Sequence, residues 1–73
     1  MTLGEAIREK RIEKGMTQLE LSQEMNVSRT FLADLERNRY APSYNTLRKL
    51  AITLDLDVNF LLKNDGNTIH DKV

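Results

Sequence analysis

The stretch TQLELSQEMNVSRTFLADLE, residues 17–36, constrains the fold of this chain more than any other. Leu21 and Met25 are spaced four residues apart, as on one face of a helix, and Leu32 and Leu35 lie three apart on a second. The residues between the two patterns, Met-Asn-Val-Ser, are too few for a long loop. The sequence therefore predicts two short helices held at a fixed angle, so that the second is presented to another molecule.

The length and composition predict one small folded domain. With 73 residues, 40% of them hydrophobic and 30% charged, the chain is typical of a soluble globular protein. Its core is marginal alone, so a second copy would add useful buried area. The absence of cysteine fits a reducing cytosol, and the sequence has neither a signal peptide nor the roughly 18 apolar residues of a membrane span. We therefore expect a cytoplasmic protein with no membrane partner.

Local signals predict an all-α, five-helix bundle with no strand. The predicted helices cover about residues 3–14, 18–25, 29–36, 44–54 and 57–62. The first four are preceded by side chains suited to capping a helix: Thr2, Thr17, Ser28 and Ser43. Thr2 and Thr17 each stand three residues before a glutamate, which is the pattern of a capping box.

Three residues mark the ends of the first three helices. Gly15, Asn26 and Asn38 tolerate the left-handed backbone conformation that commonly terminates a helix. After Lys63 the chain continues with Asn-Asp-Gly-Asn-Thr, which has little to bury. We therefore expect a folded domain over residues 1–63 and a flexible tail over residues 64–73.

Catalytic chemistry has little support in this sequence. The single histidine, His70, falls in the predicted tail and is expected to be solvated rather than held as a base. His70 and Asp71 alone do not make a zinc site, which needs three or four converging ligands. The three glycines are scattered and form no phosphate-binding loop. We expect no enzyme, no metal or other cofactor, and no small-molecule ligand.

The two short helices meet the packing demands of a helix-turn-helix, in which two helices are joined by a three- to four-residue turn. Ser22 is small where the helices would cross most closely. Asn26 stands at the turn, and Val27 follows it as an apolar residue that can pack there. Together with the inward-facing leucines, these residues predict the motif.

The span from Leu3 to Leu62 resembles the Cro and lambda-repressor type of helix-turn-helix protein, often called the XRE family. The resemblance is carried by the segments IREKRIEKGMTQLELS, MNVSRTFLADLERNR and APSYNTLRKLAITLDLDVNFLL. Asn26 and Asn38 stand where the family often has glycine, and Ser22 where it has a small alanine. Asparagine tolerates the left-handed conformation and a serine hydroxyl can bond back to a helix carbonyl, so these departures are mild.

In that family the second helix of the pair lies in the major groove of DNA with its N-terminal residues facing base edges. The resemblance therefore implies base contacts by Ser28, Arg29, Thr30 and Asp34. Helical geometry agrees for the last three, because inward-facing Leu32 and Leu35 leave them on the outward side. Arg29 suits a bidentate contact to guanine, and Thr30 suits a thymine methyl or a phosphate. Asp34 would accept from a cytosine amino group or repel wrong registers.

The resemblance also implies phosphate contacts from residues that flank the second helix. Gln18 begins the first helix of the pair, where free N–H groups and the helix dipole favour an anion. The other implied contacts are Thr17, Arg37, Arg39, Tyr40, Ser43, Tyr44 and Asn45. Tyr40 and Tyr44 have an alternative interpretation as partly buried packing residues. The net charge of zero is compatible with DNA binding, because only one face needs positive potential while the acidic C-terminal end points away.

Three further side chains are assigned structural roles. In the family, the positions of Arg11 and Glu36 meet as a partly buried salt bridge between the first helix and the end of the third. The value of such a pair is expected to be positional, since buried ion pairs are weak evidence for stability. Phe31 is large for an exposed position, and we favour packing at the edge of the core over contact with a thymine methyl.

One short helix reads only a few base pairs, and relatives therefore act as two-fold dimers on inverted repeats. Val58, Phe60 and Leu62 are more apolar than a monomer surface requires, which predicts a dimer interface. The alternative is that Phe60 packs back on the first helix. The expected partners are double-stranded DNA and a second copy of the chain, with RNA polymerase a further candidate.

These features predict a sequence-specific, DNA-binding transcriptional regulator that controls its own gene. We expect no second domain after Lys63, which would leave restriction–modification controller proteins, small phage-type repressors and antitoxin-type regulators. The phrases SRTFLADLERNR and EKGMTQ favour a controller protein. The rival class is a protein-interaction module, because fold does not settle function. A steep fall of DNA affinity with salt would separate the two.

Overall fold

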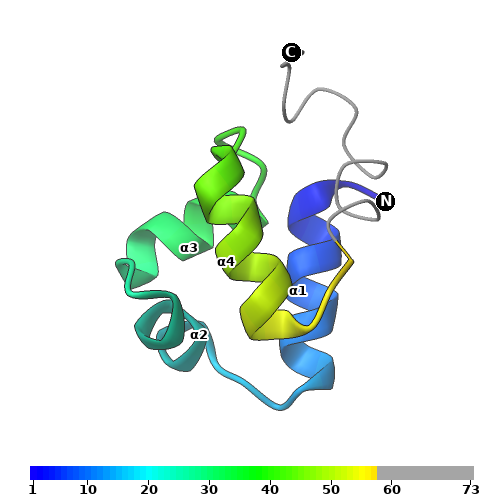
Figure 1. Cartoon of the computed structure of the whole chain (residues 1–73), viewed down its shortest axis with the longest axis vertical. Coiled ribbons are helices and arrows are strands. Elements are labelled where there is room, and N and C mark those ends of the chain that lie inside the picture. Colours follow the sequence, from blue (N-terminus) through cyan, green and yellow to red (C-terminus); the bar gives the residue numbers. More distant parts are fainter. Residues whose placement is uncertain (58–73) are drawn as a thin grey trace.

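The computed structural model describes residues 1–57, which contain four helices and no strand (Figure 1). The helices are α1 (Leu3–Glu13), α2 (Gln18–Met25), α3 (Arg29–Glu36) and α4 (Tyr44–Leu54). The all-α prediction is confirmed for these residues, and α1 ends one residue earlier than predicted. The predicted fifth helix, the domain boundary after residue 63 and the predicted tail lie outside the described residues. None of the four helices is long and apolar enough to cross a membrane.

Each helix begins with a side-chain cap. At the start of α1, the Glu5 N–H donates to Thr2 Oγ1 at 3.1 Å, and the Thr2 N–H donates to Glu5 Oε1 at 2.9 Å. Thr17 and Glu20 repeat this arrangement at α2, so both predicted capping boxes are confirmed. Ser28 and Ser43 cap α3 and α4, also as predicted. These caps satisfy N–H groups that have no partner within the helix.

Each helix also ends in one recurring way. The residue that follows the last turn takes a left-handed conformation at Gly15, Asn26, Asn38 and Asp55, with φ values of 73°, 60°, 62° and 59°. The next N–H then reaches back five residues to a carbonyl: Met16 to Arg11, Val27 to Ser22, Arg39 to Asp34, and Leu56 to Ala51. This is the main bond of the Schellman motif. The first three left-handed positions were predicted, and Asp55 was not.

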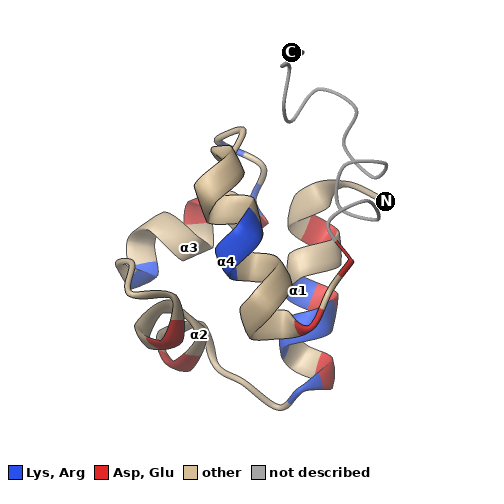
Figure 2. Cartoon of the chain, viewed as in Figure 1, with Lys and Arg blue, Asp and Glu red and all other residues tan. Residues whose placement is uncertain are grey.

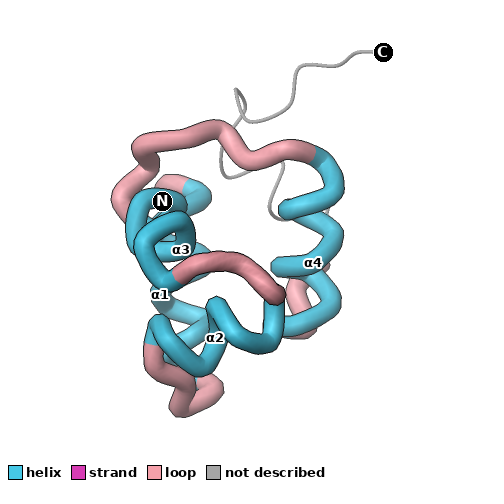
Figure 3. The backbone as a smooth tube through the Cα atoms, turned by 90° about the vertical axis from the view of Figure 1, so that its left-hand side faces the viewer, coloured by secondary structure: helices cyan, strands magenta, loops and turns pink. Residues whose placement is uncertain are grey.

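The four helices enclose one apolar core. Both α3 and α4 pack against both α1 and α2, so each pair of helices covers the other (Figure 1). The core consists of Leu3, Ile7, Leu21, Met25, Leu32, Leu47, Leu50, Ala51 and Leu54, with Met16, Val27 and Leu56 packed against it. The loop between α3 and α4 arches over one end of the molecule to reach α4 (Figure 3). The core thereby fixes α3 from behind while its other side faces outward.

The start of α1 and the end of α3 approach each other closely at Gly4. A Cβ atom on this residue would lie 2.7 Å from the Leu35 carbonyl oxygen and closer still to that of Glu36. Asn38 ties the same two ends together: its Oδ1 accepts from the Gly4 N–H at 2.9 Å, and its Nδ2 donates to Thr2 Oγ1 at 2.9 Å. The N-terminus of α1 thus lies against the C-terminus of α3, which is also the favourable arrangement of helix dipoles.

Candidate nucleic-acid interface

The α2–α3 pair forms the predicted helix-turn-helix. Ser22 is buried where the two helices meet, and its Oγ donates to the Leu19 carbonyl at 2.8 Å. Asn26 supplies the left-handed turn, and Val27 is half-buried against the core. The short turn and the buried contacts on both sides set the angle between the helices. The outward side of α3 is therefore held in a defined orientation.

The first turn of α3 presents two unengaged side chains. Arg29 and Thr30 are exposed, and within residues 1–57 neither side chain makes a hydrogen bond or an ion pair. Ser28 is also exposed, but its Oγ is occupied as the cap of α3, accepting from the Phe31 N–H at 3.0 Å. Arg29 and Thr30 are thus available to an external partner without breaking an internal contact. This is the arrangement that base-edge contacts require.

Asp34 differs from Arg29 and Thr30, although it was predicted with them. Its side chain is half-buried, and its Oδ1 lies 3.5 Å from Nε of Arg39. The sequence does contain a signal for this pair. Once Asn38 is assigned a left-handed conformation, the Schellman geometry brings Arg39 back over Asp34, and the two carry opposite charges.

Phe31 is half-buried on α3 and stacks on Tyr40, with ring centroids 5.8 Å apart and planes inclined by 29°. This fits the packing role favoured for Phe31, with a partner that the sequence did not indicate. Tyr40 and Tyr44 are 52% and 57% exposed, and for Tyr40 the stacking on Phe31 fits the alternative in which it is a partly buried packing residue. Their hydroxyl-bearing rings lie at the surface beside α3 and at the start of α4.

A buried polar network joins α1, α2 and the end of α3. Arg11 Nε donates to Glu36 Oε2 at 2.7 Å, and Arg11 Nη2 donates to Glu36 Oε1 at 3.1 Å. Arg11 Nη1 also donates to the Met16 carbonyl at 2.9 Å. The two charged side chains are 11% and 3% exposed, so the expected pair is present and more deeply buried at Glu36. The fork geometry satisfies both carboxylate oxygens.

Gln18 belongs to this network as well. Its Nε2 donates to Glu36 Oε1 at 3.1 Å, an interaction that the sequence did not indicate. An amide nitrogen carries two hydrogens, so the second remains able to donate outward. The contact fixes the Gln18 side chain at the start of α2, where the helix dipole favours an anion. Sequence spacing offered no signal, since the two residues lie 18 positions apart.

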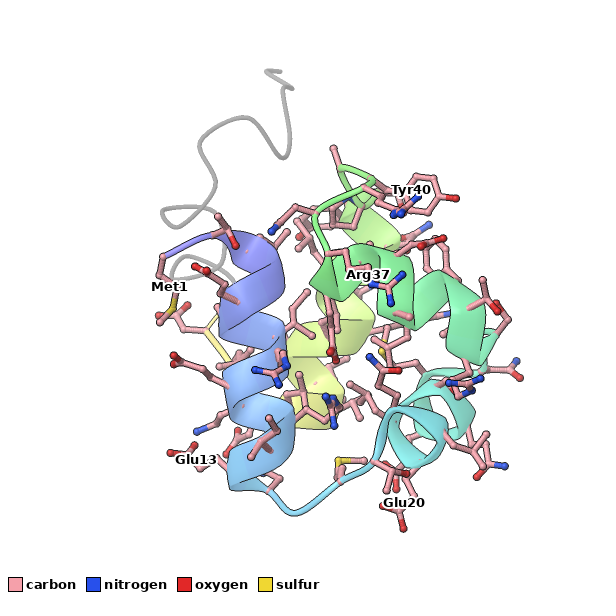
Figure 4. The ribbon with its side chains drawn as sticks, turned by 180° about the vertical axis from the view of Figure 1, so that it is seen from behind. Met1, Glu13, Glu20, Arg37 and Tyr40 are labelled. Carbon is pink, nitrogen blue, oxygen red and sulfur yellow. The ribbon has the colours of Figure 1, made fainter. Side chains whose placement is uncertain are left out.

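The remaining predicted phosphate contacts lie around α3. Arg37, Tyr40 and Asn45 are exposed, and Figure 4 shows Arg37 and Tyr40 just after α3, away from Met1, which precedes α1, and from Glu13 at the end of α1. Thr17 and Ser43 are exposed but serve as caps, and Ser43 Oγ also donates to Thr46 Oγ1 at 3.1 Å. The predicted interface residues Val58, Phe60 and Leu62 lie outside the described residues.

The charged side chains are unevenly distributed (Figure 2). A basic residue stands at the start of α3, whereas α2 carries acidic residues and α1 carries both kinds. On α1, Lys10 Nζ and Glu13 Oε1 lie 2.8 Å apart at the surface. Their hydrogen bond raises the pKa of Lys10 and lowers the pKa of Glu13. No group of residues suited to a metal ion occurs among those that the structure describes. The surface of α1 is therefore mixed in charge.

A family model described as helix-turn-helix (HTH_3) matches residues 7–61. The chain belongs to the helix-turn-helix family. This helix-turn-helix protein is 46% identical over 69 residues to the ImmF control region 10 kDa protein of Bacillus phage phi105, covering 94% of the chain and 77% of the relative. It is 42% identical over 62 residues to the immunity repressor protein of the same phage, covering 85% of the chain but only 43% of that repressor.

Solved structures share the fold. The P22 c2 repressor protein in complex with a synthetic operator superposes with a TM-score of 0.82 at 29% identity, covering 89% of this chain and 98% of that one. The biofilm regulator SinR in complex with DNA gives a TM-score of 0.77 at 35% identity, covering 84% and 98%. These relatives are transcription regulators and repressors rather than enzymes.

Proposed function

We propose that this helix-turn-helix protein is a sequence-specific DNA-binding transcriptional regulator that inserts α3 into the major groove of duplex DNA. The observation that carries the proposal is the exposed, unpartnered pair Arg29 and Thr30 at the start of a helix whose other end is fixed by buried contacts. A guanidinium held at a groove can donate two hydrogen bonds to guanine, the commonest specific contact. The DNA-bound structures of SinR and of the P22 c2 repressor support this use of the fold.

The surrounding residues would position the helix on the DNA backbone. Gln18 and the N-terminus of α2 offer donors to one phosphate, with the amide oriented by Glu36. Beyond α3, the exposed donors belong to Arg37, Arg39, Tyr40, Tyr44 and Asn45. Thr17 and Ser43 are also exposed and would add contacts at the starts of α2 and α4, which they cap. Contacts of this kind set register and orientation, while the base contacts set sequence.

A homodimer on an inverted repeat is part of the proposal. A single α3 would touch only a few base pairs, which gives a small interface for specific affinity. Two copies related by a two-fold axis would place their α3 helices in successive turns of the groove. Val58, Phe60 and Leu62 are the apolar residues proposed for the contact between copies.

We predict that Phe60→Glu yields a folded monomer with weak DNA binding, because a carboxylate would be buried in the contact between copies. Analytical ultracentrifugation of wild-type and variant protein measures the association. Circular dichroism checks that the variant is folded. A wild-type chain that stays monomeric at high concentration would remove the dimer from the proposal.

The relatives favour one type of regulator over another. The phage phi105 control-region protein and immunity repressor support a phage-type repressor or control protein, whereas the sequence phrases had favoured a restriction–modification controller. We propose the phage type, acting in the cytoplasm and controlling its own gene. An antitoxin-type role and contact with RNA polymerase stay predictions.

A binding titration tests the central proposal. The purified protein is titrated against the DNA immediately upstream of its own gene at several salt concentrations and with competitor DNA. We expect a two-fold symmetric footprint, resistance to competitor, and a steep decrease in affinity as salt rises, because bound phosphates release counterions. Weak, sequence-independent binding at every salt concentration would contradict the proposal.

A protein-interaction module is the second candidate function. The observation that favours it is the structure of SinR in complex with SinI, which superposes with a TM-score of 0.79 at 32% identity and covers 96% of this chain and 69% of that chain. A module of this class would bind a protein and no duplex DNA specifically. The same titration separates the two, with a pull-down as the next step if DNA binding is absent.

A further inference from the structure

The end of α3 folds the following loop back onto the helix. The Arg39 N–H donates to the Asp34 carbonyl at 2.9 Å, and the Asn38 N–H donates to the Leu35 carbonyl at 3.1 Å. Together these bonds form a complete Schellman motif, which carries the chain back over the last helical turn. The backbone therefore brings Arg39 to Asp34 before any side-chain interaction is made.

Two side-chain contacts then hold the loop against the outward side of α3. Arg39 Nε lies 3.5 Å from Asp34 Oδ1, and the next residue, Tyr40, stacks on Phe31. Phe31 and Asp34 are three residues apart and therefore neighbours on the helix surface. Thr30 stands one turn before Asp34 on the same strip, so the contact lies beside the residues proposed to read bases.

The two members of the ion pair differ in exposure. The Arg39 side chain is 63% exposed, whereas the Asp34 side chain is 19% exposed. An ion pair with so exposed a cation is weak, so a DNA phosphate can compete for the guanidinium. The carboxylate has no such freedom, because it is confined to the surface of α3. If Arg39 leaves, Asp34 stays where the DNA would be and needs another hydrogen-bond donor.

We propose that Asp34 sets the DNA selectivity of this protein by restraining Arg39 until a suitable base pair replaces it. The inference rests on the proposed function. In DNA, amino groups of cytosine and adenine would donate to the Asp34 carboxylate, whereas carbonyl oxygens of guanine and thymine would repel it. On a sequence that offers the amino group, Arg39 transfers to a phosphate and both charges are satisfied. On other sequences Arg39 stays paired with Asp34, and one phosphate contact is missing.

The test compares four proteins: wild type, Asp34→Asn, Arg39→Gln and the double variant. Each is titrated, over a range of salt concentrations, against the duplex footprinted upstream of the gene and against a scrambled duplex of equal length and composition. For Asp34→Asn we expect a steeper dependence of log K on log salt with the scrambled duplex, by about 0.9, which corresponds to one added phosphate contact. The preference for the footprinted duplex should fall by roughly tenfold.

The Arg39→Gln background tests whether the effect of Asp34→Asn depends on Arg39. There, Asp34→Asn should no longer steepen the salt dependence, because the guanidinium that it releases is absent. Glu24→Gln is the matched control, since it removes one exposed carboxylate from α2 and should change both duplexes equally. Circular dichroism melts check that all variants fold.

Three results would overturn the inference. An unchanged salt dependence in Asp34→Asn, or an equal effect of that substitution with and without Arg39, would show that Asp34 does not act through Arg39. An unchanged sequence preference would show that Asp34 does not set selectivity. Wild-type protein that binds no duplex would instead overturn the proposed function, and this inference with it. The two failures are therefore distinguishable before any variant is compared.

Discussion

The first and last turns of α3 are held in different ways. Arg29 and Thr30, in the first turn, project from the surface without internal partners among the described residues. In the last turn, Glu36 is bonded to Arg11 and to Gln18. Just beyond it, Asn38 is bonded to the start of α1. One helix of eight residues thus has an end that is available and an end that is fixed.

The contrast explains how a short helix can present side chains accurately. Specific contacts need donors within hydrogen-bond distance of base edges, so a helix that pivots would lose them. The fixed end supplies the rigidity, through the bonds of Glu36 to Arg11 and Gln18. Within α3, positioning and base contact are therefore assigned to different residues, and substitutions should separate the two.

Removing one partner of the buried Arg11–Glu36 pair should have the largest effect on both stability and DNA binding. Arg11→Ala leaves the Glu36 carboxylate buried without its cation, and loss of one partner from such a pair costs about 3–5 kcal/mol of unfolding free energy. Because Glu36 also orients Gln18, operator affinity should fall together with stability. Chemical denaturation and a DNA titration measure the two effects.

Lys10→Ala is the matched control for Arg11→Ala. It removes the neighbouring cation of α1, whose ion pair with Glu13 lies at the surface, and its effect should be far smaller. Equal losses of stability in the two variants would contradict a special role for the buried pair. Unchanged melting and binding in Arg11→Ala would do the same.

Gly4→Ala should have an intermediate effect, because it attacks the contact between the start of α1 and the end of α3. The new methyl group would press on the Leu35 and Glu36 carbonyls, and such overpacking typically costs about 1–3 kcal/mol. The gain in helix propensity offsets about 1 kcal/mol of this. Thermal or chemical denaturation measures the net loss.

Gly15→Ala offers the comparison for Gly4→Ala. At Gly15 nothing lies within 4 Å of an added Cβ, so only its left-handed backbone, with φ of 73°, opposes the substitution. Gly15→Ala should therefore destabilise the protein without altering its DNA selectivity. A Gly4→Ala variant that is more stable than wild type would refute the close approach at α3.

Arg29→Ala should have the smallest effect on folding. Its side chain is exposed and unpartnered within residues 1–57, so the unfolding free energy should change by less than about 0.5 kcal/mol. Operator binding should nevertheless weaken by about 1–3 kcal/mol, with selectivity relaxed at a single base pair. Affinities for a set of operators carrying single base-pair changes measure this. A uniform loss across all of them would instead assign Arg29 to the DNA backbone.

The sequence predicted those parts of the fold that depend on near neighbours. A cap needs a hydroxyl and an N–H three residues apart, as at Thr2 and Thr17, and a helix stop needs one residue that tolerates a left-handed backbone, as at Asn26. These conditions are visible in a short stretch of letters. The inward faces of the helices follow for the same reason, from apolar spacing alone.

The candidate site was less predictable, because its contacts are set by tertiary packing. Gln18 meets Glu36, and Asn38 meets Gly4, 34 positions away. Neither contact follows from local propensity, since each depends on the angle at which α1 and α2 cross α3. Asp34 is an intermediate case. Its contact with Arg39, five residues later, follows from the helix stop at Asn38, but its outward position led to the prediction of a base contact instead.

The recurring helix ends have a kinetic consequence. Every described helix starts with a cap that bonds three residues ahead and ends with a bond five residues back. Boundaries specified over such short stretches require little loop closure before they form, and helical proteins rich in local contacts fold within on the order of microseconds to milliseconds. We therefore expect each new copy to reach its native shape far faster than the ribosome adds the next residue.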